Sequence, residues 1–458
     1  MASGIRKKGN MGSLFLDLIL EFGDVVILWR ATNPTSITSD LTVVKEYYTN
    51  FKLFKKPKTG IFELRKIGQT NFLGVQSIVT DPGGPNWERK KRIMDPGFKV
   101  SRLQDQICKF YLVGEQVAEV LEREQLQNGF ADFDKVIALH AIHAISSAGF
   151  SVMDEETLMQ LSTGNTLIWD YVVSLMQEAN PLRKTKLAAM LNLDNPKRPN
   201  AEQQLKFIRE LAKRLIMDRI DSGQFGKVGD LLDFIIQANE DTGKMNMERC
   251  LEDFLTMYVA GNVTTASALN FFIAEMVRNV DILETLIKEV DEMWVGRGIS
   301  RNSSNQENEI VSALKDMVYL DAVLSETLRK HSPVVAGLKT LQQDMKMSKY
   351  VVPGGATVLI SQQVLHHHPQ YWDNPSTFDP NRFMGNNKIT PFTYVPFIAG
   401  PRACSGRKFA MLEMKVFISI WLSRLTFEKL PSSAEEILTE QSPVVRVVDN
   451  RVIVRMRN

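Results

Sequence analysis

One stretch near the C-terminus decides the fold of this chain: Phe397-Ile398-Ala399-Gly400-Pro401-Arg402-Ala403-Cys404-Ser405-Gly406. It ends an irregular, proline-rich loop, and the sequence predicts a helix over residues 404–425 that begins with it. A cysteine at a helix N-terminus faces unpaired N–H groups and the positive end of the helix dipole, which favours the thiolate. Gly400 and Gly406 would let the backbone pass close to a large flat group, and Arg402 can pair with an anion.

A thiolate in such a setting is a candidate axial ligand of haem iron. The alternative is a buried free cysteine in a glycine-rich turn. The stretch resembles the signature of the cytochrome P-450 family, phenylalanine-x-x-glycine-x-arginine-x-cysteine-x-glycine, at all five fixed positions. The resemblance implies a mainly α fold, a large helical body with small β-sheets near the N-terminus and in the C-terminal third. It also implies heme b (iron protoporphyrin IX) held by Cys404, with Phe397, Arg402 and Gly406 binding the cofactor.

A second motif precedes the cysteine stretch. Glu326 and Arg329 share one helix face, so their charges can touch, and a lone pair of this kind is usually a surface ion pair. Here it is followed by the stretch 378–383, Phe-Asp-Pro-Asn-Arg-Phe, which contains Arg382. In the family, a glutamate and an arginine on one helix meet an arginine from such a stretch. Burying three charges is costly unless each is paired, so the resemblance implies a structural lock rather than catalysis.

A third motif contains Trp87 and Lys91, which lie four residues apart on one face of a helix expected to begin near Trp87. The family uses such a pair to hold a haem propionate, so both are implied cofactor-binding residues. Arg89 and Lys90 fit a basic, solvated helix end, and in the family this exposed face often meets the electron donor. Lys339 stands where the family often has a propionate-binding arginine, and lysine offers a single charge instead of a fork.

A fourth motif, Ala260-Gly261-Asn262-Val263-Thr264-Thr265, lies in a long periodic segment over residues 249–278. It resembles the family pattern alanine-glycine-x-acid-threonine, in which one loosened helical turn makes a groove for dioxygen. The implied catalytic threonine is Thr264. The acid is missing, because Val263 occupies its position and carries no proton. Asn262 and Thr265, with water, are candidates to replace it.

The resemblance implies a monooxygenase that inserts one oxygen atom from O2 into a C–H bond of a lipophilic substrate. No flavin or iron–sulfur motif is visible, so two electrons are expected from NADPH through a reductase docked on the basic proximal face. Because of Val263, two alternatives stay open: an enzyme that uses or rearranges hydroperoxides, and a haem-binding protein that has lost turnover. Thr264 and the ordinary length of the cysteine loop favour the monooxygenase.

Substrate identity is the least visible property. Among members of the family, residues 87–98 (WERKKRIMDPGF) and 392–397 (FTYVPF) look most like cholesterol 24-hydroxylase. That likeness implies a sterol, with three residues at pocket-lining positions: Ala260, Val334 and Val335. The region 54–80, which caps the pocket in the family, differs too much for residues to be carried over.

Composition excludes several other classes. The chain has 458 residues, 44% hydrophobic and 24% charged, which is ordinary for globular proteins. Its 55 Lys and Arg against 53 Asp and Glu give a net charge of +2, which indicates no nucleic-acid partner. Three distant cysteines predict no disulfide framework, and core packing is the preferred interpretation of Cys108 and Cys250. Adjacent histidines at 366–368 cannot all face one ion, and His140 with His143 lacks a third ligand, so no metal site is predicted from histidine.

Length suggests about three domains, but the helical texture of residues 100–330 favours one large, mostly helical body. The resemblance implies that this body is a single P-450 haem domain over 1–458, with 1–12 loose. Loops are expected at 194–202, 221–230 and 297–309, and strands in the ranges 25–29, 349–360, 444–448 and 452–456. No apolar run reaches the roughly 20 residues of a membrane span. We expect a monomer with peripheral membrane contact. Family resemblance places it on the cytosolic face of the endoplasmic reticulum membrane, and a cytoplasmic location is the alternative.

Overall fold

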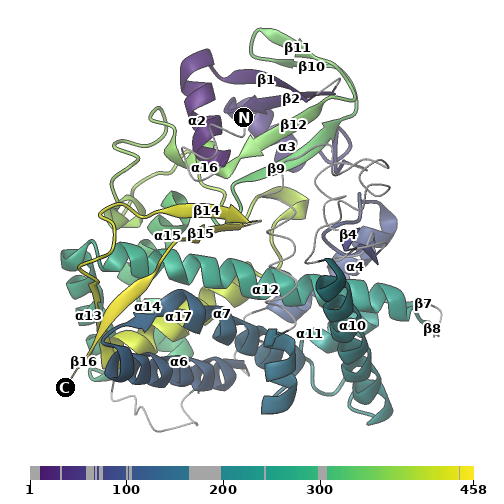
Figure 1. The fold of residues 1–458 in the computed structure, drawn as a ribbon. Helices are drawn as coiled ribbons and strands as arrows, with labels where there is room; N and C mark the ends of the chain where they lie inside the picture. The colour runs from purple at the N-terminus through teal and green to yellow at the C-terminus, as the bar shows by residue number, and fades with distance from the viewer. Residues whose placement is uncertain are drawn as a thin grey trace.

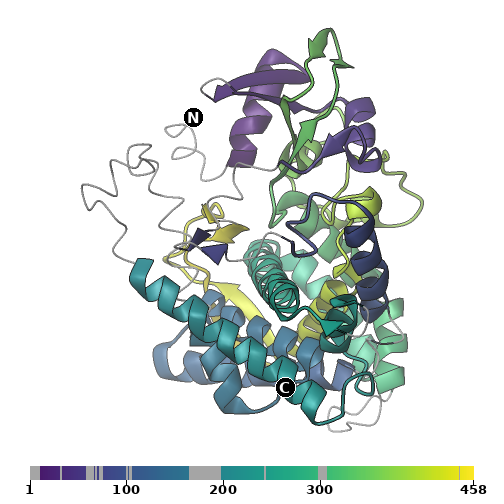
Figure 2. The same cartoon turned by 90° about the vertical axis from the view of Figure 1, so that its right-hand side faces the viewer.

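The computed structural model places a helical body beneath a smaller sheet-rich part, with one long helix running between them (Figure 1). It describes residues 11–30, 33–57, 66–67, 70–71, 76–99, 102, 106–163, 198–241, 244–297, 307–442 and 444–457. The long helix, α12 (Met247–Met276), crosses the centre of the molecule and is seen almost end-on in Figure 2. It begins where the Asn246 side chain accepts the N–H of Arg249 at 3.1 Å, a standard N-cap.

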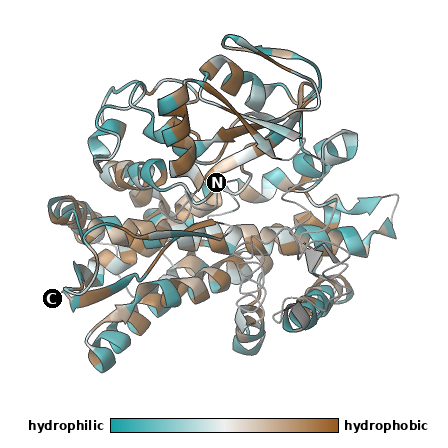
Figure 3. Ribbon diagram, turned by 45° about the horizontal axis from the view of Figure 1, so that its top comes forward, coloured by the Kyte–Doolittle hydropathy of each residue, from teal (hydrophilic) through white to brown (hydrophobic). Residues whose placement is uncertain are grey.

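The helical body packs around α12. It comprises α4 (Pro85–Met94), α6 (Ile107–Asn128), α7 (Phe133–Ala144), α10 (Arg198–Asp221), α11 (Leu231–Ala238), α13 (Val280–Trp294), α14 (Glu307–Asp316), α15 (Val318–Lys330) and α17 (Arg407–Arg424). Helix α17 lies against α6 and also contacts α12 and α13. Along these helices, hydrophobic and hydrophilic stretches alternate (Figure 3), as expected for helices with one face in a core.

The main sheet has five strands in the order β1-β2-β12-β9-β3. They are β1 (Val25–Arg30), β2 (Asn33–Thr38), β12 (Thr357–Ser361), β9 (Ala336–Leu341) and β3 (Phe54–Lys55). Strand β12 runs parallel to β2 and antiparallel to β9, so the C-terminal third joins a sheet begun at the N-terminus. Helices α2 (Met11–Phe22), α3 (Leu41–Thr49) and α16 (Gln362–His367) accompany it.

Smaller sheets complete the described chain. A three-stranded sheet has the order β13-β16-β6, and the remaining strands form antiparallel pairs. The strands are β6 (Ala131–Asp132), β13 (Leu425–Lys429), β16 (Arg451–Met456), β14 (Thr439–Ser442), β15 (Val444–Val447), β10 (Met345–Met347), β11 (Tyr350–Val352), β4 (Lys66–Ile67), β5 (Thr70–Asn71), β7 (Glu240–Asp241) and β8 (Lys244–Met245).

The mainly α fold class is therefore confirmed, and so is the long central helix. Several predicted boundaries are wrong. Residues 11–12 are helical because Phe15 and Ile19 of α2 pack in a core cluster, while residues 1–10 lie outside the described chain. Residues 198–202 belong to α10 and 307–309 to α14, and the rest of those two predicted loops, 194–197 and 298–306, is not described.

Candidate active site

The cysteine loop turns sharply before helix α17. The Cys404 N–H donates to the Phe397 carbonyl at 3.0 Å, and the Ala403 N–H donates to the Gly400 carbonyl at 2.9 Å. Gly400 has a φ of +71°, and a Cβ there would overlap the Tyr48 carbonyl oxygen of α3. Helix α17 starts only at Arg407, because the turn around Cys404 is completed first, so the predicted start at Cys404 was three residues early.

Cys404 is both accessible and closely surrounded by protein. Its side chain is accessible, yet the protein around it is close enough that burial raises the pKa of its thiol above the ordinary value. The backbone N–H groups of Gly406 and Arg407 act in the opposite direction, as does the positive charge of Lys91. A Cβ at Gly406 would meet nothing nearer than 3.8 Å. The donors expected at this helix start are thus present, and a side-chain carbon at 406 would make only ordinary van der Waals contacts.

Lys91 contacts the cysteine loop directly. Its Nζ lies 3.0 Å from Asp95 Oδ1 and donates to Ser405 Oγ at 2.8 Å. The Ser405 hydroxyl in turn donates to Asp95 Oδ1 at 2.6 Å. The side chain predicted to bind a propionate is therefore engaged with the residue that follows Cys404.

Two cations come together at the cysteine loop: Lys339, which is buried, and Arg402, which is a half-buried residue of the loop itself. Burial, together with the charge of Arg402, lowers the pKa of Lys339 to about 8. Burial also lowers the pKa of Arg402 to about 10. Lys339 donates to the Tyr47 carbonyl, and Arg402 donates to the Asp81 carbonyl at 2.9 Å. The Nη1 of Arg402 is buried and has no hydrogen-bond partner among the described residues.

Trp87 supports this cation pair without donating to it. The Arg402 guanidinium stacks on the Trp87 ring at 3.7 Å from its centroid, a cation–π contact. The indole N–H donates to the Ile78 carbonyl at 3.0 Å. Trp87 therefore positions Arg402, and its own donor is already used within the protein.

The predicted lock is assembled as a compact group of charges. Arg329 makes a bidentate contact with Glu326, at 2.7 Å from Nε and 2.8 Å from Nη2, and both side chains are fully buried. Arg382 approaches the same carboxylate at 3.4 Å. The Asp379 N–H also donates to it at 2.9 Å. These contacts join α15 to the loop that leads toward Cys404.

His366 belongs to the surroundings of this lock, and sequence reasoning missed it. Its carbonyl accepts from Arg329 at 2.8 Å, and its Nε2 accepts the Val395 N–H at 2.8 Å. Burial lowers the pKa of His366 to about 3, with Arg329 acting in the same direction. The neutral ring therefore holds Val395, which lies just before the cysteine loop, by accepting its backbone N–H. Its place in the run 366–368 suggested only a metal site, which had been rejected.

The middle of α12 presents an accessible face inside the molecule. Ala260 is exposed, while Gly261, Val263 and Thr264 are half-buried. The Thr264 hydroxyl donates to the Ala260 carbonyl at 2.7 Å, one turn back. Helix α12 is α-helical from Met247 to Met276, so the structure does not show the loosened turn that the family pattern implies.

Asn262 and Thr265 lie away from this face. Both are buried, and the Asn262 amide donates to the Tyr258 carbonyl at 2.8 Å. Neither side chain is brought together with Thr264 on the open face. Two successive residues before β9 also separate: Val334 is 43% exposed, whereas Val335 is 3% exposed and packs with Phe271 and Ala274.

Part of the predicted cap over the pocket lies outside the described residues, namely 58–65, 68–69 and 72–75. Over the described ranges, no group of three His, Cys, Asp or Glu side chains could hold a metal ion. The same ranges contain no helix long and apolar enough to cross a membrane.

Comparison with known proteins decides the family. The family profile described as Cytochrome P450 matches residues 2–453. The chain belongs to the cytochrome P450 family. Among its relatives, mouse cytochrome P450 3A41 is 26% identical over 398 residues, 80% of this chain and 75% of the relative. Cytochrome P450 4c21 of Blattella germanica is 25% identical over 472 residues, 97% of this chain and 89% of the relative.

Solved structures of the family share the fold. The haem domain of cytochrome P450DA superposes with a TM-score of 0.81 at 22% identity, covering 98% of this chain and 93% of that one. This P450 is therefore a haem-thiolate monooxygenase that uses heme b, O2 and electrons from NADPH delivered by a reductase. Its substrate is lipophilic.

The residues present fit that cofactor. Haem carries a metal that takes a thiolate, a flat ring and two carboxylates. Cys404 offers an accessible sulfur, Gly406 places no side chain beside it, and the Nη1 of Arg402 is buried without a partner among the described residues. Neither Lys339 nor Arg402 forms an ion pair with a described acidic side chain, although the charge of Asp81 favours the charged form of Arg402. The two cations therefore favour an anion at their side.

Proposed function

We propose that this P450 holds haem through the Cys404 thiolate and hydroxylates a sterol. The observation that carries the haem assignment is Cys404 itself, an accessible sulfur with the N–H groups of Gly406 and Arg407 beside it. When bound, haem supplies the chemistry that activates O2 for insertion into a C–H bond. Phe397 and Gly406 complete the loop around the sulfur.

The anionic edge of the cofactor would be held by cations. Lys339 and Arg402 are the two candidates, because burial lowers the pKa of both, and Trp87 orients Arg402 through ring stacking. Lys91 has a different role in this proposal, since its contacts hold Ser405 and Asp95 next to the thiolate. Glu326, Arg329 and Arg382 keep the loop in place from below and take no part in catalysis.

The test of the ligand is spectroscopic. The reduced parent enzyme under carbon monoxide should show the red-shifted Soret band of thiolate coordination. Cys404→Ser should lose that band. Cys250→Ser is the matched control, because Cys250 is fully buried in the first turn of α12, where burial raises the pKa of its thiol to about 12, and its loss should leave the band unchanged. A retained band in Cys404→Ser would disprove the assignment.

On helix α12, we assign to Thr264 the role of hydrogen-bonding a ligand or water. Its hydroxyl is half-buried on the accessible face of α12 and can exchange its bond to the Ala260 carbonyl for one to a ligand or water. Asn262 is bound to Tyr258, and it would have to leave that bond to help. Thr265 is buried on another side of the helix.

One observation favours a second candidate, a P450 that consumes hydroperoxides. Val263 packs against the hydrophobic core and places no carboxylate on the open face of α12. The experiment compares NADPH consumed with product formed, beside conversion of an organic hydroperoxide. Product coupled to NADPH supports the monooxygenase. Conversion of the hydroperoxide with no product from NADPH would replace it. If neither occurs, Val263→Asp should restore turnover only in a protein that merely binds haem.

The sterol assignment rests on likeness to cholesterol 24-hydroxylase in two stretches, 87–98 and 392–397, and the relatives compared above carry other names. Ala260 and Val334 expose apolar side chains, as a sterol pocket requires. Val335 supports the wall from behind, since it faces the core. The sterol assignment is supported if sterols shift the haem spectrum and fatty acids of similar length do not. It is overturned if fatty acids shift the spectrum and sterols do not.

Two surfaces fit the expected surroundings. Around the cysteine loop, the exposed residues Arg92, Arg407 and Lys408 form a basic face for the acidic surface of a reductase. At the N-terminal end, Phe22 and Trp29 are exposed large apolar residues, suited to peripheral contact with the endoplasmic reticulum membrane. Reduction rates at rising salt concentration test the first surface, and flotation with vesicles tests the second.

A further inference from the structure

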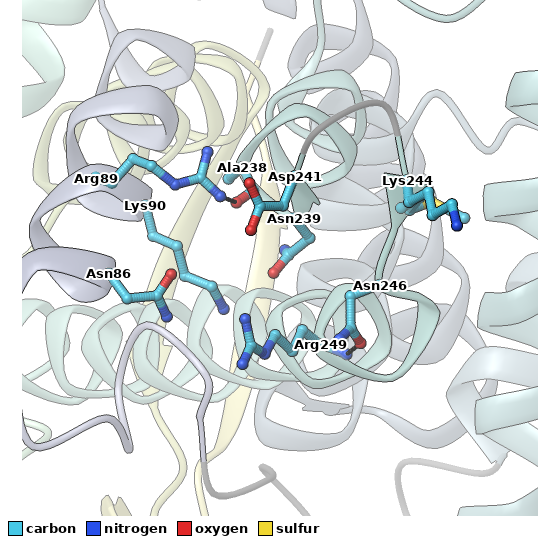
Figure 4. Close-up of a pocket in the computed structure, with 10 residues that line it drawn as sticks. Asn86, Arg89, Lys90, Ala238, Asn239, Asp241, Lys244, Asn246 and Arg249 are labelled. Carbon is cyan, nitrogen blue, oxygen red and sulfur yellow. Dashed lines mark hydrogen bonds between the residues drawn. The ribbon is translucent and has the colours of Figure 1, made fainter.

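A polar cavity of about 240 Å³ lies apart from the cysteine loop, where α4, α11, the β7–β8 hairpin and the start of α12 meet. Figure 4 shows Arg89, Lys90, Asn239 and Arg249 directed toward a common space. Lys244 stands on the hairpin and points away from that group. The cavity uses the face of α4 that was expected to be a solvated basic helix end.

That expectation is wrong for Lys90. Its side chain is 1% exposed and forms a buried ion pair with Asp253 at 2.6 Å. A second N–H of the ammonium group goes to the Gln76 carbonyl at 3.0 Å. Because an ammonium group has three N–H donors, one N–H of Lys90 has no partner among the described residues. Asp253 lies 163 residues away in sequence, so the pairing was invisible in the motif.

Two arginines add charge to the cavity. Arg89 donates to the Ala238 carbonyl at 2.9 Å, which anchors its guanidinium at the end of α11. Arg249 makes no side-chain hydrogen bond or ion pair with the described part of the chain, and it is half-buried at the start of α12. The positive end of the α12 dipole points at the same place. Asp241 is the one carboxylate among the described lining residues.

Asn239 supplies an independent sign of a ligand. Its side chain is 97% buried, since only 3% is exposed. The Nδ2 donates to the Ile235 carbonyl at 3.0 Å and to Asp253 Oδ2 at 2.8 Å, which fixes the orientation of the amide. The Oδ1 consequently faces the cavity and has no partner among the described residues. A buried acceptor left without a donor is costly, so this site requires a hydrogen-bond donor.

We propose that this cavity binds a small hydroxylated phosphate, a metabolite that carries a phosphate group and a hydroxyl. The guanidinium groups of Arg89 and Arg249 and the free donor of Lys90 take the phosphate, which arginine recognises in bidentate fashion. The Oδ1 of Asn239 accepts the hydroxyl. The volume is below the usual range of about 300–1,000 Å³ for drug-sized ligands, which favours a free small molecule over a peptide.

The probe is glycerol 3-phosphate, titrated calorimetrically into the haem-loaded enzyme, with sulfate as the comparison. Sulfate has similar charge but no hydroxyl, so its affinity should be lower by about tenfold or more. Arg249→Gln should weaken glycerol 3-phosphate about tenfold or more, and Arg249→Lys should fall between the two because it keeps the charge without the fork. Lys244→Gln should have a smaller effect than Arg249→Gln.

The matched control is Arg209→Gln. Arg209 lies on α10 and pairs with Glu248 at 2.6 Å, next to the cavity but not lining it, so its loss changes the overall charge equally. It should alter the affinity less than twofold. Three results would each overturn the proposal: equal affinity for sulfate and glycerol 3-phosphate, an equal loss of affinity in Arg249→Gln and Arg209→Gln, or no binding of glycerol 3-phosphate at millimolar concentration. The carbon monoxide spectrum checks that every variant keeps its haem site, so failure here leaves the function proposed above untouched.

Discussion

The lock of Glu326, Arg329 and Arg382 and the cation pair of Lys339 and Arg402 are both groups of largely buried charge, yet only the lock contains a carboxylate. In the lock, a carboxylate neutralises Arg329 and backbone carbonyls take its remaining donors, at 2.8 Å from His366 and 2.9 Å from Pro375. In the cation pair, burial and the charge of Arg402 lower the pKa of Lys339, and the Nη1 of Arg402 has no described partner. The Nε of Arg382 in the lock also lacks a hydrogen bond, but it lies 3.4 Å from the Glu326 carboxylate.

The difference separates structure from binding. Charges that are satisfied within the chain hold elements together, because removing one partner leaves the other stranded. Charges that the chain leaves unsatisfied are costly unless a ligand completes them. By this reasoning the lock should govern the stability of the protein, and the cation pair should govern how tightly it retains its cofactor.

The largest expected effect comes from breaking the lock. Glu326→Gln keeps the size of the side chain but leaves Arg329 as an uncompensated buried charge. We expect the free energy of unfolding to fall by about 3–5 kcal/mol, measured by urea unfolding of the haem-loaded protein. The control is Asp321→Asn on the same helix, which breaks the half-exposed pair with Lys415 and should cost about 1 kcal/mol or less. Similar losses in the two variants would contradict the distinction.

Two glycines of the cysteine loop sharpen the comparison. Gly400 has a positive φ and lies against the Tyr48 carbonyl, so Gly400→Ala should destabilise the protein by about 2–4 kcal/mol. Gly406 has a φ of −79° and no close protein neighbour. Gly406→Ala should therefore keep the urea midpoint in the presence of excess haem but release haem faster. Equal midpoints in both variants would show that the loop is not shaped by α3.

Local sequence could predict the features whose partners lie close in the chain. The cysteine loop, the Glu326–Arg329 pair and the long helix α12 were all visible as short patterns. The burial of Lys90, the ring of His366 and the packing of Gly400 on Tyr48 were not visible, because each depends on a partner tens to hundreds of residues away. The contrast between Val334 and Val335 also required the fold, since β9 decides which of two similar residues faces the core.

Acid should lower the free energy of unfolding through His366, which lies beside the lock. The unfolded chain takes up a proton on this ring near pH 6.5, whereas the folded protein resists until about pH 3. The stability contributed by the neutral ring is therefore present above pH 6.5 and is lost as the pH falls toward 3. We expect a loss of about 2 kcal/mol between pH 7 and 5 from this residue.

Comparing the pH slope of the unfolding free energy in the parent and in His366→Gln checks this expectation. His367 is shifted in the same direction and is present in both proteins, so only the difference in slope reports on His366. The variant should be less stable at pH 7 because the Val395 N–H loses its ring acceptor. Its slope should nevertheless be shallower, and parallel slopes would rule out the role assigned to the ring.

The smallest effect tests the cation pair, which contains no carboxylate. Lys339→Met removes a buried cation that no carboxylate neutralises, so the urea midpoint in excess haem should change little. Haem transfer to an acceptor protein should become about tenfold faster, equivalent to about 1.4 kcal/mol. Because the pKa of Lys339 is about 8, haem retention in the parent should also decline as the pH rises above 8. Lys339→Arg should retain haem at least as well as the parent and remove that decline, since arginine stays charged. A decline that persists in the arginine variant would place the titrating group elsewhere.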